Sequence, residues 1–178
     1  MDRGMDFLKS QVNNAVMQHK TLLQNLEDHA GQAEDQRYRD LCTRSIPKMR
    51  EHQGRLEQYQ ASIGAETGAA KNLLGKALGA ARDLADSVRE SDFLRVVGDI
   101  VTARQSQDTS ATFRVAGQQL GIPALQQLGE AGERDQEEFV REANRIVQQM
   151  FVEHARGAET AAGAGARTTA DATRGASM

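Results

Sequence analysis

Residues 91–121 read SDFLRVVGDIVTARQSQDTSATFRVAGQQLG, and this run contains no proline. Ser91 is a residue type that caps helix N-termini, and Gly121 is the type that most often ends a helix. Apolar residues recur every three or four positions, which predicts one buried helix face made of Phe93, Val97, Ile100, Val101, Ala111 and Val115. The same stripe passes through Arg104 and Asp108, so the predicted face becomes polar halfway along.

The composition predicts an all-α protein. The chain has 178 residues, of which 39% are hydrophobic and 26% charged, so it suits one soluble domain with its own core. It contains two prolines and no tryptophan, and it is rich in helix-forming residue types. No window shows the alternation of apolar and polar residues that is typical of strands.

Charge and hydropathy exclude two classes of partner. The net charge is −3 with both signs interleaved, and only 4% of residues are aromatic, which argues against nucleic-acid binding. No run approaches the roughly 18 apolar residues that cross a bilayer, and the start MDRGMDFLK lacks the apolar region of a signal peptide. We therefore expect a cytoplasmic protein that does not bind membranes.

Cys42 is the single cysteine, so the chain has no internal disulfide and no CxxC motif. It lies beside Leu41 and near Ile46 in an apolar helical pattern. We interpret it as a buried thiol rather than a reactive one.

The hydrophobic periodicity predicts four long helices and one short one. The long helices are expected at about residues 6–34, 36–63, 91–120 and 123–155, and the short helix at about 69–87. Residues 1–5 are expected to fray, and residues 6–156 form the bundle. The tail at 157–178 is rich in Gly, Ala and Thr and has no apolar period, so we expect it to be disordered.

Pro47 leaves two alternatives for the second helix. The helix begins near Asp35 and kinks at Pro47, or it begins at Ser45 with the proline in its first turn. The apolar stripe continues upstream through Tyr38 and Leu41, which favours the first alternative.

The connection between the second and third long helices is longer than a hairpin requires, and it suits a crossover from one end of a bundle to the other. The predicted fold class is an antiparallel four-helix bundle in which this long crossover carries the short helix.

Each long helix has a polar residue where its apolar series should continue. These residues are His19, His52, Arg104, Asp108 and Asp135. If the helices align antiparallel, they meet in one interior layer. Three interpretations remain open: residues at the edge of the stripe that reach water, a buried network in which Arg104 pairs with Asp108 or Asp135, or a metal site.

The ligand pattern of the metal site is incomplete. Di-metal sites in bundles use a Glu from each of two helices and Glu-x-x-His from each of the other two. Met49 stands three residues before His52, and the fourth helix offers Glu130 and Glu133 without a histidine. The metal-ligand candidates are His52 and Asp135. No GxSxG, HExxH, Walker or GxGxxG motif occurs, so we expect no catalytic residues and no cofactor.

Residues 49–64, MREHQGRLEQYQASIG, resemble the second bundle helix of bacterial ferritin-like proteins, where a polar run precedes Arg-Leu-Glu and a terminal glycine. Residues 109–121, followed by a Glu-rich fourth helix, resemble the later half of such proteins. The similarity covers about residues 6–155 and implies a four-helix bundle. It implies a di-iron or di-manganese carboxylate site where the ligands are present, and His52 alone matches a ligand position.

These observations predict a ferritin-like bundle without a working di-metal centre, which acts as a structural, interaction or stress-associated protein and forms homo-oligomers. The first alternative is an oxidoreductase with an atypical iron or manganese site drawn from His19, His52, Asp108, Asp135 and nearby glutamates. The second is a helical adaptor that assembles only with a helical protein partner.

Overall fold

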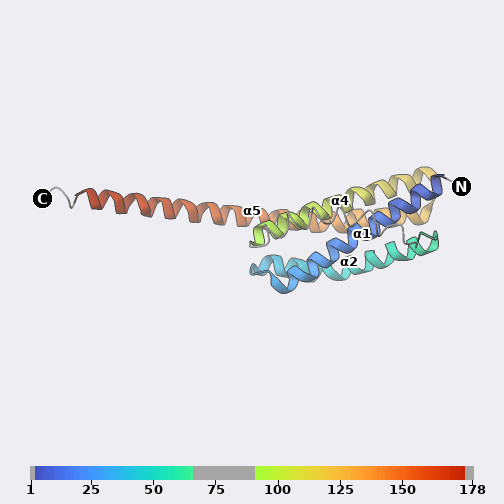
Figure 1. Cartoon of the computed structure of the whole chain (residues 1–178), viewed down its shortest axis with the longest axis horizontal. Helices are drawn as coiled ribbons and strands as arrows, with labels where there is room; N and C mark the ends of the chain where they lie inside the picture. The colour runs from blue at the N-terminus through green and yellow to red at the C-terminus, as the bar shows by residue number, and fades with distance from the viewer. Residues whose placement is uncertain (1–2, 66–90, 175–178) are drawn as a thin grey trace.

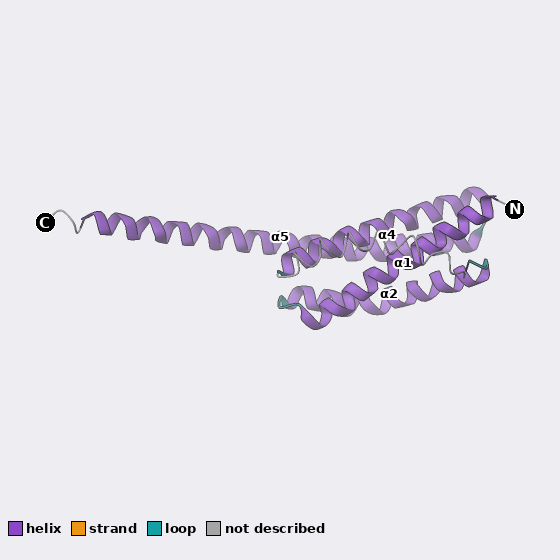
Figure 2. Ribbon diagram, viewed as in Figure 1, coloured by secondary structure: helices purple, strands orange, loops and turns teal. Residues whose placement is uncertain are grey.

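A computed structural model of the chain describes residues 3–65 and 91–174, with side-chain surroundings as far as residue 157. Within these ranges the chain is helical and contains no strand (Figure 2), so the all-α prediction is confirmed for them. The helices are α1 (Arg3–Gln32), α2 (Gln36–Ser62), α4 (Asp92–Leu120) and α5 (Pro123–Arg174), shown in Figure 1. None of the described helices has an apolar stretch that would cross a membrane.

The helices form two hairpins, α1–α2 and α4–α5, which lie side by side (Figure 1). The α2 helix lies against α5, and α1 lies against α4. Ion pairs join Arg37 to Glu153 and Lys48 to Glu138, so residue numbers rise along α2 as they fall along α5. The α2 and α5 helices therefore run in opposite directions.

The helix ends follow the local chemistry of the sequence. The α2 helix begins at Gln36, where the Asp35 carboxylate accepts hydrogen bonds from the backbone N–H groups of Arg37 and Tyr38. Pro47 lies inside this helix, so the helix begins near Asp35, as in the first of the two alternatives, and not at Ser45. The predicted cap at Ser91 and stop at Gly121 are confirmed: the Ser91 hydroxyl accepts from the Leu94 N–H, and Gly121 has a φ of 65°.

The first and last helices extend beyond their expected bounds. The α1 helix begins at Arg3, so residues 3–5 are helical rather than frayed. The α5 helix continues to Arg174 and projects beyond the other three (Figure 1), although disorder was expected from residue 157. The stretch contains no proline and many alanines, the residue type with the highest helix propensity. The predicted short helix at 69–87 lies outside the described residues.

Polar residues divide the core into two apolar clusters. One cluster contains Leu22, Leu26, Leu41, Met49, Val96 and Phe139 among its members. The other contains Val12, Val16, Leu56, Phe113, Leu125 and Leu128. On every helix a polar residue lies between its contributions to the two clusters, as His19 does on α1 and Gln136 does on α5.

The α4 helix is rotated relative to the prediction. Val101 and Val115, expected in the core, are 62% and 41% exposed. The buried face is Val96, Asp99, Ile100, Ala103, Ser106, Ser110, Phe113 and Gly117. This face is buried because its small residues let α4 approach α5 closely. A Cβ on Gly117 would lie 2.3 Å from the backbone nitrogen of Gln126, so no larger residue fits there.

Candidate functional site

A layer of polar side chains crosses the middle of the bundle, with members from all four helices. We call it the polar layer, and it consists of His19, His52, Gln53, Ser106, Ser110 and Gln136, none more than 7% exposed. His19 and His52 were predicted to lie in such a layer. Gln53, Ser106, Ser110 and Gln136 were not.

The α4–α5 half of the polar layer is a closed set of hydrogen bonds. Gln136 Nε2 donates to Ser106 Oγ at 2.6 Å, and Ser110 Oγ donates to Gln136 Oε1 at 3.2 Å. Ser110 Oγ also lies 3.0 Å from the Ser106 carbonyl oxygen. The buried amide is thus satisfied on both sides, as buried polar groups usually are. These bonds fix the position of α5 along α4.

In the α1–α2 half, Gln53 determines the tautomer of His19. Gln53 Nε2 donates to the Val16 carbonyl at 3.4 Å and to Glu57 Oε1 at 2.7 Å, so its Oε1 is the atom 3.0 Å from His19 Nδ1. An amide oxygen only accepts, so the His19 proton resides on Nδ1. His19 Nε2 is then a buried acceptor, and neither it nor His52 Nδ1 has a hydrogen-bond partner among the described residues.

The two imidazoles lie against each other and against a glycine. Their ring centroids are 4.8 Å apart with an interplanar angle of 66°, an edge-to-face arrangement. A Cβ on Gly132 would lie 2.5 Å from His52 Nε2 and 2.5 Å from Ser110 Oγ. Gly132 therefore provides the space on α5 that the His52 ring occupies.

Burial keeps both imidazoles neutral. Burial, together with the neighbouring His19 and Arg55, lowers the pKa of His52 to about 3. Burial also lowers the pKa of His19, partly offset by the hydrogen bond to Gln53 and by the negative charge of Asp135. The polar layer therefore presents uncharged groups near neutral pH.

Three residues predicted for the interior layer lie elsewhere. Arg104 and Asp108 are exposed on the outer side of α4, because the helix is rotated away from the predicted orientation. The Asp135 side chain is 13% exposed and lies beside the layer, and its carboxylate pairs with Arg134 at 3.3 Å. The predicted buried pairing of Arg104 with Asp108 or Asp135 is therefore wrong.

A second buried polar cluster lies near the α1–α2 turn. Tyr38 Oη donates to Asp99 Oδ2 at 2.5 Å, and His29 Nδ1 lies 2.9 Å from that oxygen and 2.7 Å from Tyr38 Oη. Asp99 is 1% exposed and was not predicted. It shares a helix face with Val96 and Ala103, but the exposed face of α4 has the same spacing, so periodicity alone does not identify Asp99 as buried.

Cys42 is buried, as expected for a thiol in an apolar helical pattern. Burial and the nearby charge of Asp99 raise its pKa to about 12. The sulfur is therefore a protonated thiol near neutral pH, a weak nucleophile.

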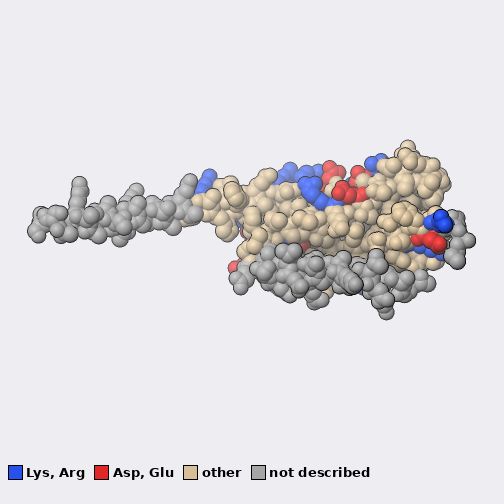
Figure 3. Space-filling model, turned by 45° about the horizontal axis from the view of Figure 1, so that its top comes forward, with Lys and Arg blue, Asp and Glu red and all other residues tan. Residues whose placement is uncertain are grey.

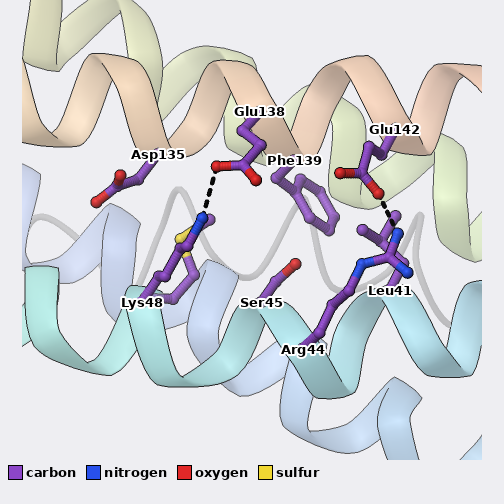
Figure 4. Close-up of a pocket in the computed structure, with 9 residues that line it drawn as sticks. Leu41, Arg44, Ser45, Lys48, Asp135, Glu138, Phe139 and Glu142 are labelled. Atoms are coloured by element: carbon purple, nitrogen blue, oxygen red, sulfur yellow. Dashed lines mark hydrogen bonds and ion pairs between the residues drawn. The ribbon is translucent and has the colours of Figure 1, made fainter.

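A cavity of about 260 Å³ lies between α2 and α5 (Figure 4). Apolar side chains and Ser45 line it, and charged pairs border it: Lys48 Nζ donates to Glu138 at 2.6 Å, and Arg44 donates to Glu142. These charges are engaged across the helix interface. We interpret the cavity as part of the α2–α5 contact.

The polar layer does not fit a di-metal carboxylate centre. Its buried donors are imidazoles, amides and hydroxyls, whereas the ferritin-like arrangement needs carboxylates from several helices. Asp135, the carboxylate predicted as a metal ligand, is paired with Arg134. Among the described residues, no three His, Cys, Asp or Glu side chains are grouped so that they could hold one ion.

No protein-family model, no curated protein and no solved structure matches this chain.

Proposed function

We propose that this chain is a ferritin-like four-helix bundle that acts in the cytoplasm as a self-associating interaction protein, without metal-dependent catalysis. The observation that carries the proposal is the set of large apolar side chains left in contact with solvent on packed helices. Val101 and Val115 on α4 are 62% and 41% exposed, and Phe151 and Val152 on α5 are 63% and 44% exposed. Exposed apolar side chains that share a helix face favour protein association.

The ferritin-like part of the proposal rests on the order and direction of the helices. Two helical hairpins are joined by a long connection, and each helix runs opposite to the neighbours it contacts (Figure 1). This arrangement is typical of bundles with one long crossover.

The proposed role of the polar layer is structural. Gln136 is satisfied by Ser106 and Ser110, and Gln53 by His19, Val16 and Glu57. A buried network of this kind favours one helix register, because a shifted register leaves polar groups unpaired.

Light scattering coupled to size-exclusion chromatography tests self-association on the full chain. We expect the molar mass to rise from that of one chain to that of a dimer as the concentration increases through the micromolar range. A molar mass of one chain throughout that range would contradict the proposal.

The alternative oxidoreductase requires bound metal, so metal content separates the two functions. We expect chain purified from cells supplied with iron and manganese to hold far less than one ion per bundle, because the polar layer lacks carboxylates. Elemental analysis of the wild-type chain and of His52→Ala measures this. Stoichiometric metal in the wild type that is lost in His52→Ala would favour the oxidoreductase.

A further inference from the structure

The α4 helix carries two seams on opposite faces. The inner seam is buried and advances by alternating steps of three and four residues: Val96, Asp99, Ala103, Ser106, Ser110, Phe113 and Gly117. The outer seam lies two residues before each of these: Leu94, Val97, Val101, Arg104, Asp108, Ala111 and Val115. Two residues correspond to a rotation of about 200°, so the outer seam faces away from the bundle. All of its members are exposed or partly exposed.

The outer seam has the spacing of a coiled-coil contact. Alternating steps of three and four residues keep side chains on one line facing a partner helix. The seam spans about 32 Å from Leu94 to Val115 at the rise of an α-helix. It is also more apolar than the inner seam, which contains Asp99, Ser106 and Ser110. Figure 3 shows broad areas of the described surface that carry no Lys, Arg, Asp or Glu.

Six of the seven residues in the outer seam are arranged symmetrically about position 106, and Leu94 is the exception. Val97 and Val115 are equidistant from this position, and so are Val101 and Ala111. Arg104 and Asp108 flank it on either side. Reading these six residues backwards therefore places an apolar residue against an apolar one and a cation against an anion, while Leu94 falls opposite Gln118.

We propose that a second copy of this chain docks antiparallel along the outer seam of α4, with a two-fold axis beside position 106. Val97 then packs on the partner's Val115 and Val101 on the partner's Ala111. Arg104 forms an ion pair with the partner's Asp108, and two-fold symmetry repeats each contact once. The inference rests on the proposed self-association and names its surface.

Charge selects the antiparallel direction. A parallel arrangement would place Arg104 against Arg104 and Asp108 against Asp108, which is unfavourable. Within the described parts of the chain, neither Arg104 nor Asp108 makes an ion pair. The ion pairs formed there by arginine and aspartate involve other residues. Both charges are therefore available to a partner.

Charge reversal tests the pairing. Arg104→Asp and Asp108→Arg, made singly in the full chain, each place two like-charge pairs in the interface. We expect the dimer dissociation constant, measured by analytical ultracentrifugation, to rise at least about 10-fold for each. The double variant and an equimolar mixture of the two single variants restore opposite charges, so both should dimerise with nearly wild-type strength.

The controls separate folding from association. Both residues are exposed, so thermal unfolding of the single variants, followed by circular dichroism at low concentration, should match the wild type. Arg141→Asp changes an exposed arginine on α5 and should leave the dissociation constant unchanged. Dimerisation that is unaffected by Arg104→Asp and Asp108→Arg would overturn the inference while leaving the proposed function standing. A wild-type monomer would overturn both.

Disulfide crosslinking tests the direction. In the antiparallel dimer, position 101 faces position 111 of the partner and lies about 15 Å along the axis from the partner's position 101. We expect Val101→Cys/Ala111→Cys to form a covalent dimer on mild oxidation and Val101→Cys alone not to. Efficient crosslinking of Val101→Cys alone would indicate a parallel dimer and overturn the inference.

Discussion

The buried imidazoles of His19 and His52 make the stability of the fold sensitive to acid. In the unfolded chain a histidine binds a proton with a pKa near 6.5, whereas in the folded chain burial lowers the pKa of His52 to about 3. Below pH 6.5 the unfolded state therefore binds more protons than the native state. The contribution of the neutral, buried His52 to the free energy of unfolding is fully present above pH 6.5. It is lost as the pH falls towards 3.

We expect the unfolding free energy to fall as the pH is lowered from 6.5 to 4. In His52→Gln the slope of the unfolding free energy against pH should be smaller by up to about 1.4 kcal/mol per pH unit, which corresponds to one proton. Denaturant unfolding of both chains at several pH values measures the difference, which cancels the common contribution of the carboxylates. Gln24→Ala, which changes an exposed residue without an ionisable group, is the control and should keep the wild-type slope. Identical slopes for His52→Gln and the wild type would contradict the neutral assignment.

Replacing Gly132 by alanine gives a second prediction. The direction of the resulting change in stability shows whether the His52 ring occupies the space beside this glycine. Alanine normally stabilises a helix relative to glycine by about 1 kcal/mol. At Gly132 the added methyl group would lie 2.5 Å from His52 and from Ser110 Oγ, so we expect Gly132→Ala to destabilise the fold by about 1–3 kcal/mol. Gly54→Ala is the control, since nothing lies within 4 Å of its Cβ, and it should be neutral or stabilising. Denaturant unfolding at one pH compares them, and a stabilising Gly132→Ala would show that His52 does not occupy this space.

At the scale of the helix, the ends at Asp35, Ser91 and Gly121 were predictable, and which face of α4 is buried was not. Ser91, Gly121 and Asp35 act through their own backbone and side-chain chemistry, which the sequence shows directly. The two faces of α4 have the same spacing, so the period alone cannot tell them apart. Counting large apolar residues then selects the wrong face, because α4 meets α5 through serine and glycine at backbone distance.

The rotation of α4 is tested by truncating one side chain on each face. Phe113 is 5% exposed, so Phe113→Ala should lower the unfolding free energy by about 3–5 kcal/mol. Val115 is 41% exposed, so Val115→Ala should change it by less than about 0.5 kcal/mol when measured at concentrations where the chain is monomeric. Denaturant unfolding measures both values. Equal losses for the two variants would be inconsistent with the orientation of α4 described here.

For the whole molecule, the sequence indicated a bundle with a polar middle but not how that middle is built. His19 and His52 interrupt apolar stripes and were identifiable for that reason. Gln53, Ser106 and Gln136 are residue types that usually lie on helix surfaces, and only their neighbours on other helices make them interior. Their roles depend on tertiary contacts between residues far apart in the chain, which periodicity along one helix does not contain.

The polar layer crosses the core without dividing the molecule into independent halves, because each helix runs through both apolar clusters. Separate unfolding of one half would break all four helices at the layer and leave its hydrogen bonds unpaired. We therefore expect one cooperative transition, with the most protected amides in both clusters exchanging at the same free energy of opening. Hydrogen exchange on the isolated full chain, compared with thermal unfolding, tests this. A gradual melt with weak protection would favour the alternative in which the helices assemble only with a partner, because such a chain has no cooperative core of its own.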